Sequence, residues 1–214
     1  MHKLSELAEK YGTDKLIHGF TEIYDKHFNS QKEKVRSLLE IGIHEGRSLR
    51  MWRDYFVNAE RIVGWDIHMY EIDQFGRGIT TAVVNQERLA DTAFALDPSP
   101  TFDVIVEDGK HSMKGQQESL AYLWSKLNPG GTFIIEDLHT SLPHNPYEWA
   151  GGQCLPDFSN SSLLALYGLQ DTGKIKSVYM TKEQEELISS ECLSCTVYDV
   201  KGDGRHITSI LVKK

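Results

Sequence analysis

One segment constrains the fold more than any other: residues 35–41 are mostly apolar and lead directly into a glycine-containing turn. An apolar run of this length is typical of a central parallel strand, which is buried on both faces. Gly42 and Gly46 free the backbone of the turn and let a ligand approach closely. Ser48 offers a hydroxyl near the start of a helix expected over residues 49–56. In an α/β sheet, such a unit is typical of a nucleotide-type cofactor site.

The residues of the turn indicate which cofactor it would bind. The dinucleotide fingerprint is Gly-x-Gly-x-x-Gly, whereas this turn has only Gly42-x-x-x-Gly46. Glu40 at the end of the strand and Glu45 within the turn add two carboxylates, which would repel a pyrophosphate. They suit a ligand with cationic groups, such as the amino group and sulfonium of S-adenosylmethionine. The alternative is a tight turn that binds nothing.

Apolar runs and helical patterns alternate along the rest of the chain. We expect strands over residues 61–67, 79–84, 102–108 and 132–137, a long helix over 112–127, and a C-terminal hairpin of residues 193–200 and 206–212. This alternation predicts an α/β fold with a Rossmann-like, doubly wound and mostly parallel sheet that ends in an antiparallel hairpin.

The sequence has no internal repeat and no linker, so we expect a single domain over residues 1–214. Residues 1–34 precede the first strand and contain two short helical patterns. They are expected to form an N-terminal helical cap. This cap either folds over the cofactor cleft or only covers the sheet.

Composition excludes several classes of function. The net charge is −8, from 23 basic and 31 acidic residues, and no basic stripe is present, which argues against nucleic acid as a partner. No apolar run approaches the length of a membrane span, and the first residues lack an apolar signal region. We therefore expect a cytoplasmic protein that does not bind membranes. Cys192-x-x-Cys195 lacks a second ligand pair for zinc and is interpreted as structural.

Polar side chains at the ends of two further strands are candidate cofactor contacts. Asp66 ends the second predicted strand, where an acidic residue can accept hydrogen bonds from ribose hydroxyls. Asn85 and Gln86 follow the third strand, and amide side chains there can read an adenine edge. Asn85 could instead only cap the helical segment that follows it.

Acidic residues also gather where the fourth and fifth strands end. Asp108 follows one strand, and Glu136 and Asp137 follow the other. Three carboxylates in one cleft repel each other unless a cation neutralises them. An all-oxygen set selects a hard divalent ion, Mg²⁺ first and Mn²⁺ second. The alternative is two acidic turns that never meet.

Histidines near these acids are candidates for chemistry on the acceptor. His111 lies three residues after Asp108, where a neutral imidazole could take a proton from a hydroxyl group bound at the metal. A role as metal ligand in a mixed nitrogen and oxygen site is the alternative. Residues 138–158 are loop-like and could form a substrate wall, so His139 and Trp149 are candidate substrate contacts.

Four motifs together resemble one family: Tyr11-Gly12-Thr13-Asp14-Lys15, Leu39-Glu40-Ile41-Gly42-x-x-x-Gly46, Asp108-Gly109-x-His111-Ser112 and Ile135-Glu136-Asp137-Leu138-His139-Thr140. This family is the Mg²⁺-dependent sugar O-methyltransferases of macrolide tailoring, of the mycinamicin and tylosin type. The resemblance spans residues 11–212. More distantly, the sequence is similar to cephalosporin-hydroxylase-like proteins.

The resemblance implies a class I S-adenosylmethionine fold and a set of roles for named residues. Asp108, Glu136 and Asp137 would be the metal ligands, and His111 the general base. The implied cofactor contacts are Thr13, Glu40, Gly42, Gly46, Ser48, Asp66 and Gln86, to which we add Asn85. Members of this family tend to assemble, so a homo-oligomer is expected.

The function predicted from the sequence is methyl transfer from S-adenosylmethionine to a hydroxyl of a sugar-containing acceptor. The acceptor would be a glycosylated natural product, a nucleotide sugar or a polysaccharide unit. One alternative is a metal-dependent oxidative tailoring enzyme, although ferrous sites of that kind want two histidines and one carboxylate. Another alternative is a non-catalytic binding protein that keeps the cofactor fold.

Overall fold

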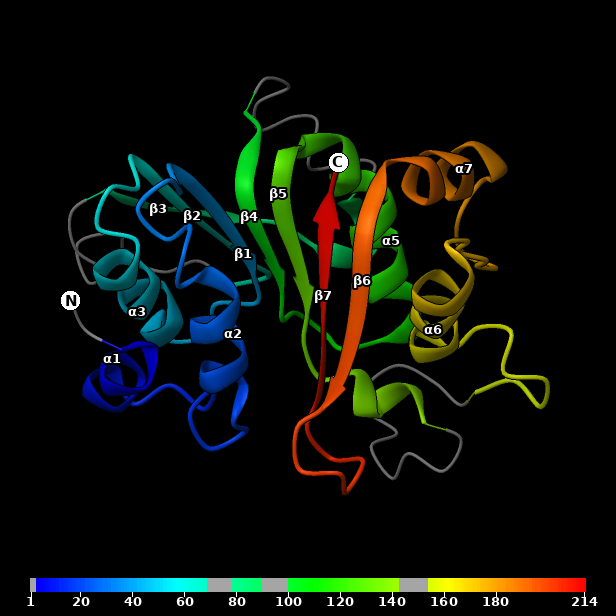
Figure 1. The fold of residues 1–214 in the computed structure, drawn as a ribbon, viewed down its shortest axis with the longest axis horizontal. Helices are drawn as coiled ribbons and strands as arrows, with labels where there is room; N and C mark the ends of the chain where they lie inside the picture. Colours follow the sequence, from blue (N-terminus) through cyan, green and yellow to red (C-terminus); the bar gives the residue numbers. More distant parts are fainter. Residues whose placement is uncertain (1–2, 69–77, 90–99, 143–153) are drawn as a thin grey trace.

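The strands of this computed structural model form one sheet. The structure describes residues 3–68, 78–89, 100–142 and 154–214. Within these ranges the sheet has seven strands in the order β3-β2-β1-β4-β5-β7-β6 (Figure 1). Their bounds are β1 Ser37–Ile41, β2 Arg61–Asp66, β3 Ile79–Val83, β4 Phe102–Glu107, β5 Leu127–Ile135, β6 Cys192–Asp199 and β7 Ile207–Lys213.

The direction of the strands confirms the predicted fold class. The five strands β1 to β5 are parallel, and β7 lies antiparallel to both β5 and β6. The chain builds β1, β2 and β3 outward in one direction and then returns to place β4 on the other side of β1. This reversal of strand order opens a crevice at the carboxyl ends of β1 and β4, where α/β proteins bind ligands.

Helices cover both faces of the sheet. Their bounds are α1 Leu4–Tyr11, α2 Phe20–Phe28, α3 Arg47–Tyr55, α5 Met113–Leu123, α6 Ser162–Thr172 and α7 Lys182–Glu191, with short 3₁₀ turns η2 Gln86–Arg88, η3 Trp124–Lys126 and η4 Leu138–Ser141. Helices α1, α2 and α3 lie on one side of the sheet, and α5, α6 and α7 lie on the other (Figure 1). The side chains of the first three form one hydrophobic cluster with the sheet, and those of the other three form a second one. None of the helices within the described ranges is both long enough and apolar enough to cross a lipid bilayer.

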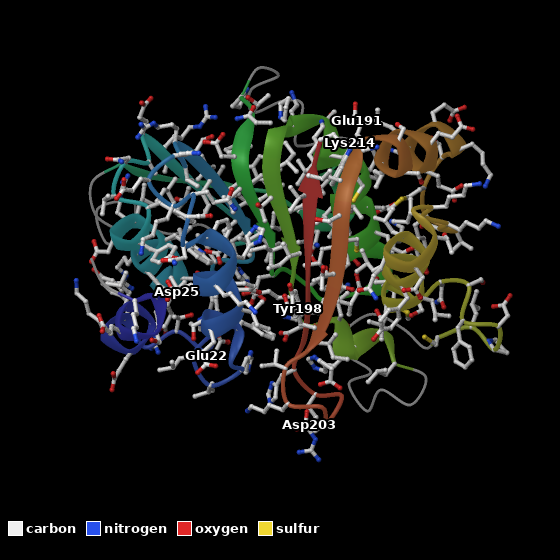
Figure 2. All side chains as sticks on the ribbon, viewed as in Figure 1. Glu22, Asp25, Glu191, Tyr198, Asp203 and Lys214 are labelled. Carbon is white, nitrogen blue, oxygen red and sulfur yellow. The ribbon has the colours of Figure 1, made fainter. Side chains whose placement is uncertain are left out.

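Particular residues end or cap the helices through their backbone conformation and hydrogen bonds. Gly12 ends α1 in the left-handed conformation that glycine tolerates best. Ser112, Ser161 and Thr181 cap the starts of α5, α6 and α7, because each side-chain oxygen accepts a hydrogen bond from a backbone amide of the first turn. At the far end of the sheet from the ligand crevice, the amide of Lys214 donates to the carbonyl of Glu191 (2.7 Å), next to the start of β6 (Figure 2).

The expected helix over residues 112–127 is shorter than its pattern indicated. It ends at Leu123, and β5 begins already at Leu127, five residues before the predicted start of this strand at residue 132. Leu127 pairs with Phe102 of β4, and the register shifts before Thr132 pairs with Val104. Burial of Trp124 and Leu127 in the core therefore outweighs the turn-forming tendency of the residues that follow.

The crevice requires a glycine at its base. Gly42 has a φ of +80°, and a Cβ built on it would lie 2.0 Å from the carbonyl oxygen of Asp108. The backbone is fixed on both sides, since the amide of Gly42 donates to Trp65 (2.8 Å) and the amide of Asp108 donates to Ile41 (2.9 Å). The absence of a side chain at this position lets the ends of β1 and β4 approach each other.

We predict that Gly42→Ala destabilises the fold far more than Gly173→Ala does. Gly173 has a similar φ of +69°, but a Cβ there would meet no atom within 4 Å. Its substitution should cost about 1–2 kcal/mol, the strain of a left-handed alanine, whereas Gly42→Ala adds a backbone clash. Urea unfolding of both variants measures the difference. Equal losses of stability would show that the strand ends are not held so close.

Candidate functional site

A cleft of about 480 Å³ lies at the carboxyl ends of the parallel strands. Its volume is within the range of small-molecule sites. It is bounded by the turn after α1, the turn after β1, the end of β2, and the residues that follow β4 and β5. The lining residues are Gly12, Thr13, Asp14, Gly42, Ile43, His44, Glu45, Arg47, Ser48, Asp66, His68, Asp108, Gly109, His111 and Asp137.

Asp66 organises the wall of the cleft formed by the turn after β1. One carboxylate oxygen accepts hydrogen bonds from the backbone amides of Ile43 (3.0 Å) and His44 (3.1 Å). The other accepts from the amide of His68 (3.0 Å). A carboxylate has about four acceptor positions, so Asp66 can still accept a hydrogen bond from a hydroxyl of a bound ligand.

Other predicted cofactor residues lie below the surface of the cleft. Glu40 is fully buried and accepts hydrogen bonds from the hydroxyl of Ser48 (2.6 Å) and the indole of Trp52 (3.3 Å). Gly46 caps α3 with a φ of +67°. Thus Thr13, Gly42, Ser48 and Asp66 line the cleft, whereas Glu40 and Gly46 shape it from beneath.

Asn85 and Gln86 do not line the cleft. The side chain of Asn85 accepts a hydrogen bond from the amide of Glu87 (3.0 Å), which is its predicted alternative role as a cap. Gln86 is buried, donates to Glu107 and to Ser119 (3.0 Å), and accepts from the amide of Lys110 (2.8 Å). Gln86 therefore holds the Asp108–His111 turn in place from behind.

Lys15 lies at the centre of the carboxylates that the strand ends bring together. Its side chain is fully buried, and its Nζ lies 2.7 Å from Asp108, 2.8 Å from Glu136 and 3.3 Å from Glu40. Glu136 also accepts a hydrogen bond from the hydroxyl of Tyr24 (3.0 Å). A buried charge is tolerated only when it is paired and hydrogen-bonded. Lys15 pairs with all three carboxylates and donates hydrogen bonds to two of them, Asp108 and Glu136.

This cluster of Lys15 and its three carboxylates carries more negative than positive charge. Burial alone would lower the pKa of Lys15, but Asp108, Glu136 and Glu40 hold it well above its usual value. Burial raises the pKa of each of these three carboxyl groups, and Lys15 opposes that rise. One ammonium group faces three carboxylates, so a further cation would be accommodated favourably beside them.

Next to this cluster, three side chains could share a cation. Asp108, His111 and Asp137 each offer a ligand atom, and these atoms all lie within 4.8 Å of one another. Nε2 of His111 lies 3.5 Å from Asp137, and its Nδ1 lies 4.0 Å from Asp108. The structure thus brings together two of the three predicted metal ligands, Asp108 and Asp137, with His111. It places Glu136 behind them, with its two carboxylate oxygens engaged by Lys15 and Tyr24.

Backbone strain is concentrated in the same place. Four non-glycine residues of the described ranges have a positive φ, and three of these, His44, His111 and Asp137, line the cleft. Such conformations cost about 1–3 kcal/mol each and persist where the surrounding structure enforces them. The side chain of Thr140 contributes here by donating to the carbonyl oxygen of His111 (2.7 Å).

Further histidines surround Asp137 on its other side. His139 lies 3.7 Å and His18 4.0 Å from one of its carboxylate oxygens. The ring of His18 stacks on that of His206, with a centroid distance of 5.0 Å. Burial lowers the pKa of both His139 and His206, which favours uncharged rings. Trp149, the other predicted substrate contact, lies outside the described residues.

Comparison with known proteins decides the family. The family model described as "Methyltransferase domain" matches residues 39–138, which contain the glycine turn, Asp66 and the turn from Asp108 to His111. The chain carries a methyltransferase domain. This finding agrees with the strand order and with the place of the cleft in the sheet.

Relatives of this methyltransferase domain act on sugars. Mycinamicin VI 2''-O-methyltransferase from Micromonospora griseorubida is 31% identical over 215 residues, which cover 95% of this chain and 50% of that protein. The 8-demethyl-8-alpha-L-rhamnosyl tetracenomycin-C 2'-O-methyltransferase from Streptomyces olivaceus is 34% identical over 149 residues, 64% of this chain and 38% of that protein. The chain therefore spans about half the length of the first of these relatives, and less of the second.

A solved structure extends the similarity to the whole domain. The mycinamycin-pathway methyltransferase MycE, in complex with Mg, SAH and mycinamycin VI, superposes with a TM-score of 0.79 at 28% identity. The match covers 100% of this chain and 55% of MycE. The class I methyltransferase fold expected from the sequence is confirmed.

The sequence assigns no role to Lys15 or to His18. Lys15 is part of the Tyr11–Lys15 motif, and His18 lies in the N-terminal segment of residues 1–34. A lysine in an apparently polar turn gives no signal of burial, because its partners Asp108 and Glu136 are far away in the sequence. The motif itself was the one available indication.

We predict that Lys15→Met lowers the free energy of unfolding by about 3–5 kcal/mol, because it leaves two buried carboxylates, Glu40 and Glu136, and the half-buried Asp108 without their counter-charge. Lys10→Met is the matched control, since Lys10 makes an ion pair of the same 2.7 Å length with Asp54 but is largely exposed. The control should leave stability unchanged. Urea unfolding of both variants tests this, and equal behaviour would contradict the proposed importance of burial.

Proposed function

We propose that this protein transfers the methyl group of S-adenosylmethionine to a hydroxyl of a sugar-containing acceptor, with the help of a divalent metal ion. The observation that carries the proposal is the group of Asp108, His111 and Asp137 at one end of a cofactor-type cleft. The curated relatives, named as methyltransferases of macrolide and tetracenomycin sugars, support the class of acceptor.

The cofactor would lie along the cleft. Asp66 is placed to accept hydrogen bonds from ribose hydroxyls, and Thr13, Gly42 and Ser48 line the rest of the site. Glu40 and Gly46 support this wall from beneath. Asn85 and Gln86 remain predicted contacts of the adenine, although the amide of Gln86 is used within the protein. The negative charge of the strand ends suits a sulfonium better than a pyrophosphate.

The donor set fits a hard divalent ion, Mg²⁺ or Mn²⁺. Asp108 and Asp137 both offer carboxylate oxygens at the cleft, and the excess of carboxylates over Lys15 leaves negative charge to be neutralised. Glu136, the third predicted ligand, would act in this structure by holding Lys15 against Asp108. A divalent ion at this place supplies positive charge that lowers the pKa of a nearby hydroxyl group.

His111 is proposed as the general base. Its ring is flanked by Asp108 and Asp137, which orient it toward the same end of the cleft. It would take the hydroxyl proton while the methyl group passes from sulfur to the acceptor oxygen, so that S-adenosylhomocysteine is released. Either carboxylate stabilises the imidazolium that forms.

The extent of the domain and the role of its N-terminal cap are also proposals. Residues 1–214 would act as one methyltransferase domain with residues 1–34 as its cap, and this cap contributes Gly12, Thr13 and Asp14 to the cleft. That contribution favours a cap that folds over the cofactor. A cytoplasmic location, assembly into a homo-oligomer and the lack of a nucleic-acid partner stay predictions.

The first experiment is a calorimetric titration of S-adenosylhomocysteine into the purified protein, once with Mg²⁺ and once with chelator. Micromolar binding supports the cofactor assignment. Mass spectrometry then tests methyl transfer from S-adenosylmethionine to mycinamicin VI and to methyl α-L-rhamnopyranoside. Absence of binding in both titrations would overturn the proposed function.

We predict that His111→Ala removes most of the turnover and leaves the affinity for S-adenosylhomocysteine nearly unchanged, because the base does not hold the cofactor. Loss of a general base typically costs about 10²–10⁴-fold in rate. Mg²⁺ affinity separates the two possible roles of this side chain. An intact affinity supports the base, whereas a large loss would make His111 a metal ligand instead.

We predict that Asp137→Asn weakens Mg²⁺ binding, because it removes one negative charge from the group that would hold the ion. Isothermal titration of Mg²⁺ into the cofactor-loaded protein measures this loss directly. Asp157→Asn, an exposed aspartate whose partner Ser159 is also exposed, serves as the control. A wild-type protein that is equally active in excess chelator would refute the metal site.

A further inference from the structure

Three histidines from distant parts of the sequence meet beside Asp137. His18 precedes α2, His139 lies in η4, and His206 precedes β7. His18 and His139 face the same carboxylate oxygen of Asp137 at 4.0 Å and 3.7 Å, and His206 stacks on His18 with an interplanar angle of 29°. We call His18, His139 and His206 the histidine wall.

The histidine wall is held in place by contacts between the N-terminal turn and the C-terminal hairpin. The ammonium of Lys201 donates to the carbonyl oxygen of Ile17 (2.9 Å). A Cβ at Gly19 would lie only 2.8 Å from Val200, so the turn and the hairpin pass in close contact. Figure 2 shows Asp203 at the tip of this hairpin, at the same end of the sheet as η4. The stacked pair therefore has a fixed position.

Asp137 separates the histidine wall from the cofactor cleft. One of its oxygens lies 3.5 Å from His111, which lines the cleft, and the other faces His18 and His139, which do not. Methyl transfer requires the acceptor oxygen to approach from the side opposite the departing sulfur. With the cofactor in the cleft, an acceptor on the histidine-wall side of Asp137 would lie beside the end of the cleft that holds His111, the proposed base.

We propose that the histidine wall is the subsite that binds the sugar ring of the acceptor, an inference that rests on the proposed function. An imidazole ring carries two nitrogen atoms that can form hydrogen bonds with the hydroxyl groups of a sugar. The stacked pair of His18 and His206 also offers a flat aromatic face to the C–H groups of a pyranose ring. The subsite thus recognises an uncharged, hydroxyl-rich ring.

A second metal site is the other use for clustered histidines, and the geometry does not favour it. In the described parts of the chain, the only group of three or more ligand atoms close enough to hold an ion is that of Asp108, His111 and Asp137. His18 and His139 approach Asp137 without joining this group. Hydroxyl recognition therefore accounts better for their arrangement.

The test compares steady-state kinetics of the full chain, with Mg²⁺ present and mycinamicin VI or methyl α-L-rhamnopyranoside as the varied substrate. His18→Ala and His206→Ala should raise the KM for the sugar at least tenfold, with kcat and the affinity for S-adenosylhomocysteine changed less than threefold. His18→Phe keeps the flat face without hydrogen bonds, so its effect should be smaller. His27→Gln is the matched control, because His27 lies on neighbouring α2 and bonds to Thr132 instead.

A measurement on the wild-type protein tests the histidine wall even if the variants fail to fold. In protein saturated with S-adenosylhomocysteine and Mg²⁺, titration with methyl α-L-rhamnopyranoside should shift the assigned ring signals of His18, His139 and His206 in NMR spectra, and not that of His27. Sugar methylation with unshifted histidine signals, or with unchanged KM in the variants, would overturn the histidine wall and leave the proposed function intact. Binding of S-adenosylhomocysteine without methylation or binding of either sugar would overturn the sugar acceptor itself, and the wall with it.

Discussion

The pairing of one buried ammonium with three carboxylates, two of them buried, is the interaction on which the rest of the site depends. Lys15 reaches from the N-terminal turn to Glu40, Asp108 and Glu136, which stand at the ends of three adjacent strands. Without that charge the strand ends would repel one another. With it, the same contacts fix the turn that carries Thr13 into the wall of the cleft. The ion pairs therefore join the cofactor region and the metal region into one structure.

The sequence was sufficient for the fold because the fold depends on local patterns. The apolar run before Gly42, the strand-end acids and the C-terminal hairpin each leave a periodic signal within about ten residues. The site was predictable only in part. Asp108 and Asp137 are marked by their strands, but nothing local indicates that Lys15 would be buried or that Gln86 would turn inward to hold a loop. Those outcomes depend on partners that only the folded chain brings near, as does the early end of the helix at Leu123.

How deeply each carboxylate is buried determines whether it binds protein groups or remains available to a ligand. Glu40 and Glu136 are fully enclosed and bind protein groups, whereas Asp108 and Asp137 retain partial exposure at the cleft. Buried carboxylates are costly and must be satisfied by fixed partners, while those at the surface of a cleft are available to a ligand. Burial distinguishes Gln86 from His111 in the same way. Gln86 is buried and supports the turn from Asp108 to His111, whereas His111 lines the cleft.

The contact between the N-terminal turn and the C-terminal hairpin has a consequence for how the protein is made. Lys15 and Glu136 are 121 positions apart, and Tyr24 and Thr208 are 184 apart, yet both pairs are hydrogen-bonded. During synthesis from the N-terminus, the glycine turn and the first strands emerge long before β7 and the hairpin. The nascent chain therefore lacks part of its cluster of acids until Glu136 has emerged, and it lacks the Tyr24–Thr208 hydrogen bond until β7 has emerged. Such distant contacts slow folding. The order of translation makes the contacts between the hairpin and the N-terminal turn the last of these to form.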